Sequence, residues 1–176
     1  MTSYPGGINA FMQPPTGGDG LSTPWTGLTS ALCGFHQGDL FLVAGRPGMG
    51  KSMKGVGRFE SRHHEFSEIS HYLKHLAGQF GLTVVLLSQL NRECEKAARR
   101  PQLSDLKETG SLEEDADVVL FVHRPEQYNR QDPALRGKAE FIIGKQRNGP
   151  TGKRNMVFQH EYQRFVEVTN DEGMNE

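Results

Sequence analysis

Apolar runs separated by polar and glycine-containing stretches divide the chain into short strands and one long helix. Residues 62–80 carry apolar side chains at helical spacing opposite a polar face, which predicts an amphipathic helix that ends at Gly81. Weaker strands are expected over 156–158 and 165–168, after a hairpin turn signal at Asn148-Gly149. Near-continuous apolar strands that alternate with a helix are typical of α/β proteins with a largely parallel central sheet. Runs of this kind, which predict buried strands, cover 39–44, 83–88, 117–122 and 139–143.

Both ends of the chain lack this patterning. Residues 1–24 are rich in Gly, Pro and Thr and predict a flexible tail, and residues 169–176 predict a disordered C-terminal tail. A short helix is expected from residue 28 to 33, closed by Gly34. The folded unit is therefore expected over 25–168, and the 176 residues suffice for one good core.

Composition excludes several classes of protein and leaves the predicted fold unchanged. The net charge of −1 gives no global basic field, although a local stripe of Arg and Lys is still compatible with nucleic-acid binding. Cys33 and Cys94 have no CxxC spacing, which favours a reducing compartment over a disulfide framework or a zinc site. No apolar run approaches the ~20 residues of a membrane span, and the start does not resemble a signal peptide. We therefore expect a soluble, cytoplasmic protein.

A phosphate-binding motif follows the first predicted strand. Its glycines allow backbone N–H groups to curl around phosphate oxygens where a Cβ would clash. Lys51 is expected to reach the β- and γ-phosphates, and the Ser52 hydroxyl to bind Mg²⁺. The strand directly before the motif is the context that separates true P-loops from chance matches. The residues that match G-x-x-x-x-G-K-[ST] are Gly45, Arg46, Pro47, Gly48, Met49, Gly50, Lys51 and Ser52.

Four further stretches, 78–92, 100–111, 114–119 and 144–152, resemble the C-terminal motor domain of the DnaB-type replicative helicases. They occur in the order expected of that family, and with the P-loop the resemblance covers about residues 20–168. It implies a RecA-like P-loop NTPase core that binds ATP and Mg²⁺. It also implies a hexameric ring that grips single-stranded DNA and unwinds duplex DNA during replication.

The resemblance assigns roles to three residues near the nucleotide. Gln89, at the end of a predicted strand, would sense the γ-phosphate, and Lys145 and Arg147 would reach the ATP of a neighbouring subunit. Residues two apart on an extended hairpin arm leave it on the same side, so these two cations can act as a pair. Such a pair neutralises charge that develops on a transferring phosphoryl group. Without the resemblance, they would be interpreted as a solvated basic hairpin.

The loop from Arg99 to Gly110 would line the central pore and grip single-stranded DNA. In the family, the last four residues of this loop contact phosphates largely through the backbone. Such contacts carry no base information, so binding should tolerate any sequence and weaken with salt. The alternative for Arg99 and Arg100 is an ordinary solvated charge pair. The DNA-contacting residues implied by the resemblance are Arg99, Arg100, Lys107, Glu108, Thr109 and Gly110.

One departure from the family concerns the catalytic carboxylates. In the family, a strand ending in an Asp for Mg²⁺, together with a catalytic Glu, lies between the P-loop and the helix that matches residues 62–80. Here Ser52 is followed almost directly by 53–59, which resembles the sequence after that strand. We therefore expect an internally truncated core that binds ATP without hydrolysing it alone. The family's N-terminal helical domain is not matched either, so hexamers should be weak or absent.

Two alternatives remain open from the sequence. One is a non-catalytic nucleotide- or DNA-binding remnant of a phage or decayed helicase gene. The other is that the sequence lacks a segment that a longer, active helicase carries.

Overall fold

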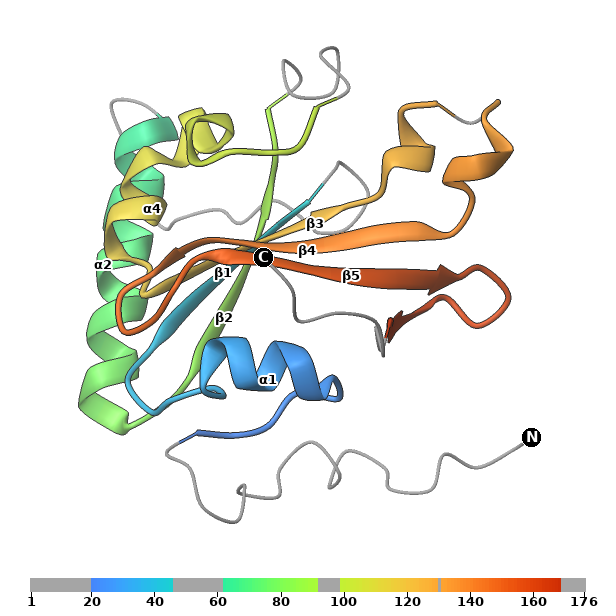
Figure 1. Ribbon diagram of the computed structural model, residues 1–176. Helices are drawn as coiled ribbons and strands as arrows, with labels where there is room; N and C mark the ends of the chain where they lie inside the picture. The colour runs from blue at the N-terminus through green and yellow to red at the C-terminus, as the bar shows by residue number, and fades with distance from the viewer. Residues whose placement is uncertain (1–19, 46–61, 92–98, 130, 169–176) are drawn as a thin grey trace.

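The computed structural model describes residues 20–45, 62–91, 99–129 and 131–168, and of 62–66 and 107–111 it describes the backbone alone. The described residues form one sheet with helices on both faces (Figure 1). Within these ranges, no helix has the length and apolar character needed to cross a membrane.

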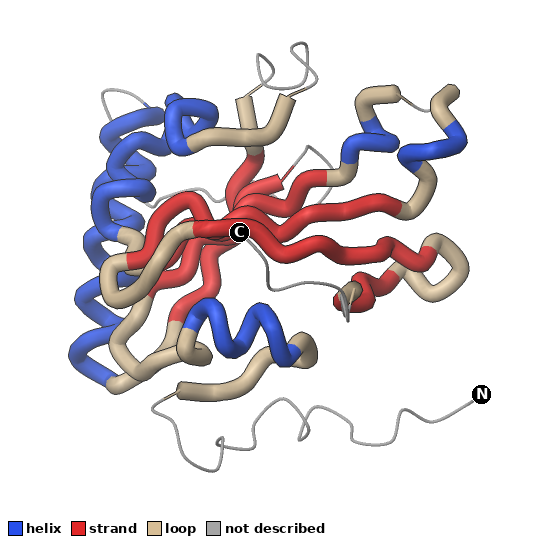
Figure 2. The backbone as a smooth tube through the Cα atoms, viewed as in Figure 1, coloured by secondary structure: helices blue, strands red, loops and turns tan. Residues whose placement is uncertain are grey.

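The sheet has six strands in the order β2-β1-β3-β4-β5-β6 (Figure 2). β1 pairs in parallel with β2 and with β3, whereas β3, β4, β5 and β6 pair antiparallel in succession. The expected α/β class is thus confirmed, but the expectation of a largely parallel sheet is wrong, because parallel pairing is confined to β2, β1 and β3. Short connections such as the one at Asn148-Gly149 can join only antiparallel neighbours. The strands are β1 Leu40–Gly45, β2 Val84–Gln89, β3 Val118–His123, β4 Lys138–Gln146, β5 Gly152–Gln159 and β6 Arg164–Glu167.

The helices cover the two faces of the sheet unequally. The long α2 has the bounds that its apolar spacing predicts, and it packs with the short α4 on one face, while α1 lies on the other (Figure 1). The described connections between strands also contain the 3₁₀ helices η2, η3 and η4. The helices are α1 Thr26–Leu32, α2 Arg62–Phe80 and α4 Gly110–Asp115, with 3₁₀ helices η2 Leu103–Thr109, η3 Pro125–Gln127 and η4 Pro133–Leu135.

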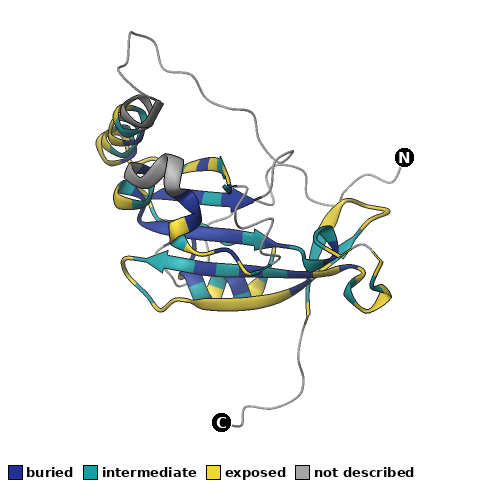
Figure 3. Ribbon diagram, turned by 90° about the horizontal axis from the view of Figure 1, so that it is seen from above, coloured by how far each residue is buried: buried dark blue, intermediate teal, exposed yellow. Residues whose placement is uncertain are grey.

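Two apolar cores result, one on each side of the sheet. Figure 3 shows the buried residues along the strands between them. On the α2 side, Leu42 of β1 and Phe121 of β3 pack with Leu112 of α4. On the α1 side, Leu28 packs with Phe41 of β1. A buried Leu or Phe contributes roughly 1.5–3 kcal/mol relative to an exposed one, so these two layers carry most of the favourable energy of folding.

The folded region begins before the boundary expected at residue 24. Leu21 and Phe35 exchange two backbone hydrogen bonds of 2.8 Å, and the Thr23 hydroxyl donates to the carbonyl of Trp25 at 2.7 Å. Gly34 allows this contact, because its φ of +86° is costly for other residues and its Cα lies against the backbone at Gly20. Residues 1–19 and 169–176 lie outside the described residues.

Candidate functional site

The carboxyl ends of β1 and β2 meet at one edge of the sheet. Gly45, the first residue of the P-loop motif, is the register partner of Gln89, and the Leu90 amide donates to the Gly45 carbonyl at 2.9 Å. Ligands of α/β proteins bind at this edge, outside the carboxyl ends of the parallel strands. The other P-loop residues, Arg46, Pro47, Gly48, Met49, Gly50, Lys51 and Ser52, lie outside the described residues.

Lys145 and Arg147 project to the same side of their hairpin, as their spacing predicts. The Lys145 ammonium donates to the carbonyls of Glu113 and Glu114 at 2.6 and 3.1 Å, and Arg147 donates to the Glu114 carbonyl at 2.9 Å. Both cations therefore cap the carboxyl end of α4, where unpaired carbonyls attract positive charge. Burial, and then the nearby Arg147, lower the pKa of Lys145.

This pair lies toward the opposite end of the strands from Gly45. Lys145 is the register partner of Val119, and the Arg147 amide donates to the carbonyl of Asp117, whose own amide donates to Leu40. Leu40 begins β1, and Gly45 lies five residue steps further along the strand, about 16 Å at roughly 3.3 Å per residue. The pair is therefore remote from the start of the P-loop in its own chain.

Asp117 is a buried carboxylate that the sequence analysis did not single out. It accepts from the Leu40 amide at 2.8 Å and from the Lys74 ammonium of α2 at 2.5 Å, and it lies 3.6 Å from Arg147 Nε. It thus joins β1, α2 and the Lys145–Arg147 hairpin. A carboxylate directly before an apolar strand was the available signal, but its partners are distant in sequence.

The two arginines of the expected DNA loop are both held by carboxylates. Arg99 forms two 2.7 Å hydrogen bonds to Asp105, whose side chain is 3% exposed. Arg100 forms bonds of 2.6 and 2.7 Å to Glu140 of β4. The backbone of 107–110 passes from η2 into α4, and the side chains of Lys107, Glu108 and Thr109 are not described.

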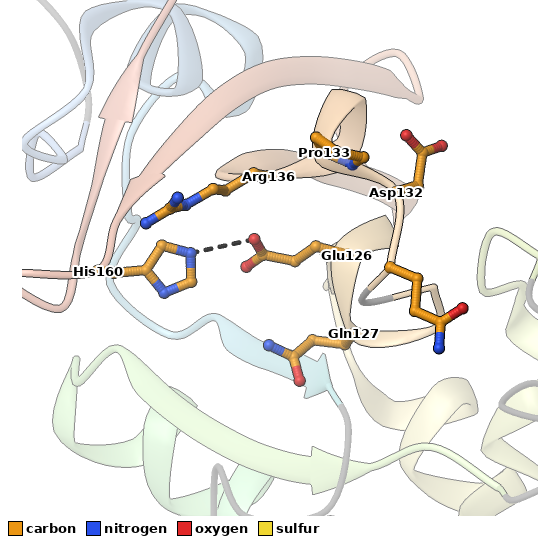
Figure 4. A pocket seen from close by; sticks show the side chains of 7 residues that line it. Glu126, Gln127, Asp132, Pro133, Arg136 and His160 are labelled. Carbon is orange, nitrogen blue, oxygen red and sulfur yellow. Dashed lines mark hydrogen bonds and ion pairs between the residues drawn. The ribbon is translucent and has the colours of Figure 1, made fainter.

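A hollow of about 650 Å³ opens beside the connection that follows β3 (Figure 4). The buried Glu126 lies at its base and accepts from the Gly137 amide at 2.7 Å and pairs with His160 at 3.0 Å. Burial alone would raise the pKa of Glu126, but hydrogen bonds from Gly137, Arg124 and His160 together lower it. The exposed Arg136 points into the same hollow. The sequence analysis missed this hollow because η3, η4 and the β5–β6 turn form it jointly.

A comparison with models of protein families shows which family the chain belongs to. The family model for the DnaB-like helicase C terminal domain matches residues 52–167. The chain belongs to this family. The expected resemblance to the C-terminal domain of the DnaB-type helicases is thus confirmed. In the described residues, no group of three His, Cys, Asp or Glu side chains is placed to hold a metal ion.

Curated DnaB-like relatives are similar over the same region. The chain is 49% identical over 112 residues to the replicative DNA helicase DnaB of Mycobacterium leprae (strain TN), covering 63% of this chain and 18% of that one. It is 46% identical over 114 residues to DnaB of Pasteurella multocida (strain Pm70), covering 64% and 24%. The matches thus span about a quarter or less of these relatives.

Solved structures support the fold. A solved ATPase domain aligns with a TM-score of 0.76 at 22% identity, covering 87% of this chain and 93% of that one. A DnaB-like replicative helicase, solved in a study of its interactions with primase, aligns with a TM-score of 0.77 at 21% identity, covering 87% and 63%. The RecA-like helicase ATPase fold expected from the sequence is therefore confirmed.

Proposed function

We propose that this chain is a nucleotide- and single-stranded-DNA-binding helicase motor domain that holds ATP and Mg²⁺ without hydrolysing ATP alone. ATP would bind the segment 45–52, with Lys51 on the β- and γ-phosphates and Ser52 on Mg²⁺. The pairing of Gly45 with Gln89 is the observation that carries this proposal. It brings the start of the P-loop and a polar amide to the ligand-binding edge of the sheet.

The position of Lys145 and Arg147 favours action on a neighbouring subunit. Because both lie level with the amino-terminal part of β1, neither faces the phosphate-binding edge of its own chain. In a homo-oligomeric ring, a neighbour's ATP could lie against them. The pair would then exchange the Glu113 and Glu114 carbonyls for phosphate oxygens, which are stronger acceptors for cations.

Single-stranded DNA would bind the loop from Arg99 to Gly110. The backbone of 107–110 supplies N–H groups at the start of α4, which suit phosphate oxygens. Because Asp105 holds Arg99 and Glu140 holds Arg100, phosphates would have to compete with carboxylates for these two side chains.

The proposed lack of hydrolysis rests on the residues that end the parallel strands. In the part of the chain that the structure describes, β1, β2 and β3 end at Gly45, Gln89 and His123, and none is a carboxylate. A motor of this class needs carboxylates there to hold Mg²⁺ and to position water. The internal deletion that we propose after Ser52 would account for the lack of carboxylates at these strand ends.

Nucleotide binding is tested by the fluorescence anisotropy of a labelled ATP analogue with Mg²⁺. Lys51→Ala should weaken binding by about tenfold or more, because it removes a charge-assisted contact to the phosphates. Lys54→Ala, outside the motif, is the matched control and should bind as the parent does. Equal affinity for the parent and Lys51→Ala would refute the proposed site.

DNA binding is tested with labelled single-stranded oligonucleotides of two unrelated sequences. Affinity should be similar for both and should fall with salt, with a log–log slope of about −0.7 per neutralised phosphate. Lys107→Glu should weaken binding, and Lys138→Glu on β4 should not. Strong preference for one sequence, or indifference to Lys107→Glu, would contradict the assignment of this loop.

A further inference from the structure

β2 exposes two large aliphatic side chains on one face. Leu86 is 6% exposed beneath the helices of the α2 side, but Val85 and Leu87 are 51% and 54% exposed. The register places Val85 beside Phe41 and Leu87 beside Val43, so they share the face that α1 covers over the middle of the sheet. The α1 layer leaves these two side chains in contact with water.

Among the described residues, the outward backbone groups of Val85 and Leu87 have no strand partner either. The Val84 amide donates to Asp39 and the Leu90 amide to Gly45, which shows that the even-numbered residues of β2 direct their polar groups toward β1. Because consecutive residues of a strand direct these groups to opposite sides, Val85 and Leu87 direct theirs outward. Among the described strands, none pairs with this outer edge.

The other edge of the sheet is covered. The Trp25 indole donates to the Phe165 carbonyl of β6 at 2.9 Å, and Glu167 accepts from the Gly27 amide at 2.9 Å. β6 also carries Arg164 and Glu167, and charged residues protect an edge against pairing. β2 has no such protection, because residues 83–91 contain no charged residue and no proline.

We propose that β2 pairs antiparallel with β2 of a second copy of this chain, about a two-fold axis at Leu86. In that register Val85 of each copy faces Leu87 of the other, so their outward N–H and C=O groups bond reciprocally. The exposed side chains of both copies then form one apolar cluster across the joint. An uncharged strand meets its own copy without repulsion, and the two-fold pairing closes after two chains.

Another strand as the partner of this β2 edge fits the observations less well. Pairing of β2 with β6 of another copy would extend without limit, and Trp25 and Glu167 already engage that edge. The proposal depends on neither nucleotide nor DNA binding, so it stands or fails separately from the proposed function.

Sedimentation velocity over about a hundredfold range of concentration tests the pairing. The parent chain should show a monomer–dimer equilibrium. Val85→Lys and Leu87→Lys should each raise the dimer dissociation constant by about tenfold or more, because each places a cation opposite an aliphatic side chain in the apolar cluster and sets the two lysines diagonally across the joint. Val157→Lys is the matched control, since Val157 lies on β5 and is 42% exposed. It should leave the dissociation constant unchanged.

Hydrogen exchange provides a measurement that needs no variant. The amides of Val85 and Leu87 should be protected at high concentration and should exchange freely when the chain is diluted to monomer. Three results would overturn the proposal: monomer throughout, a dimer indifferent to both lysines, or protection of these amides in the monomer. The last would mean that the chain itself covers the edge.

Discussion

Carboxylates hold the two arginine side chains to which we assign contacts with DNA. The surroundings of these ion pairs decide how easily each cation is released. Arg99 is paired with Asp105, which is almost completely buried, so breaking that pair would leave a buried charge without its partner. The Arg100 side chain is 60% exposed, and solvent weakens its pair with Glu140. A DNA phosphate should therefore displace Glu140 from Arg100 more readily than Asp105 from Arg99.

Glu140 should make stability depend on pH. The hydrogen bond from Arg100 lowers the pKa of Glu140 below its ordinary value of 4.5. Because the folded-state pKa is the lower one, this contribution is present above about pH 4.5 and is lost as pH falls through the folded-state value. Urea unfolding should find Glu140→Gln less stable than the parent at pH 7, and the difference should shrink in acid.

Glu161→Gln is the control for this pH dependence. Glu161 is exposed and forms no ion pair within the described ranges, so its replacement should leave the unfolding free energy unchanged at both pH values. A difference between the parent and Glu140→Gln that stays constant from pH 7 into acid would show that ionisation of Glu140 does not stabilise the fold.

At the scale of elements, the sequence predicted what local patterning controls. The helix over 62–80 has its predicted bounds. β1, β2 and β3 each begin and end one residue later in the chain than the predicted runs. The patterning missed η3 and η4, because turns of three residues carry no periodic signal. It also missed the partners of Asp117 and Asp105, because contacts between distant elements are set by how the elements pack.

β4 extends beyond its predicted end, and this extension contains an irregularity. The register with β3 shifts between Val119 and Leu120, which leaves Gly144 of β4 without a Cα partner. Such bulges redirect the residues that follow, here Lys145 and Arg147. Gly144 also lies against the ring of Phe121, which is fully buried.

Gly144→Ala should therefore destabilise the protein. A Cβ at this position would overlap the Phe121 ring, which has no space to move, and overpacking of a core typically costs about 1–3 kcal/mol. Gly152→Ala on β5 is the matched control, since its Cβ would meet nothing within 4 Å. It should leave the free energy of unfolding unchanged or raise it by up to about 1 kcal/mol. Equal chemical-denaturation midpoints for the two variants would contradict the packing argument.

At the scale of the molecule, the two ends of the parallel strands have separate roles in this account. The carboxyl ends present Gly45 and Gln89 to a nucleotide, and the hairpin toward the amino ends presents Lys145 and Arg147 to a neighbouring chain. The antiparallel β2 pairing proposed above is a two-fold contact and would not by itself produce a ring.

The central claim is that this chain binds ATP and does not hydrolyse it alone. It is tested most directly by single-turnover hydrolysis of radiolabelled ATP, with the protein in excess, with Mg²⁺, and with and without single-stranded DNA. We predict that ATP is bound and that phosphate release does not exceed that of Lys51→Ala, with or without DNA. Phosphate release that DNA stimulates and that Lys51→Ala abolishes would contradict the account.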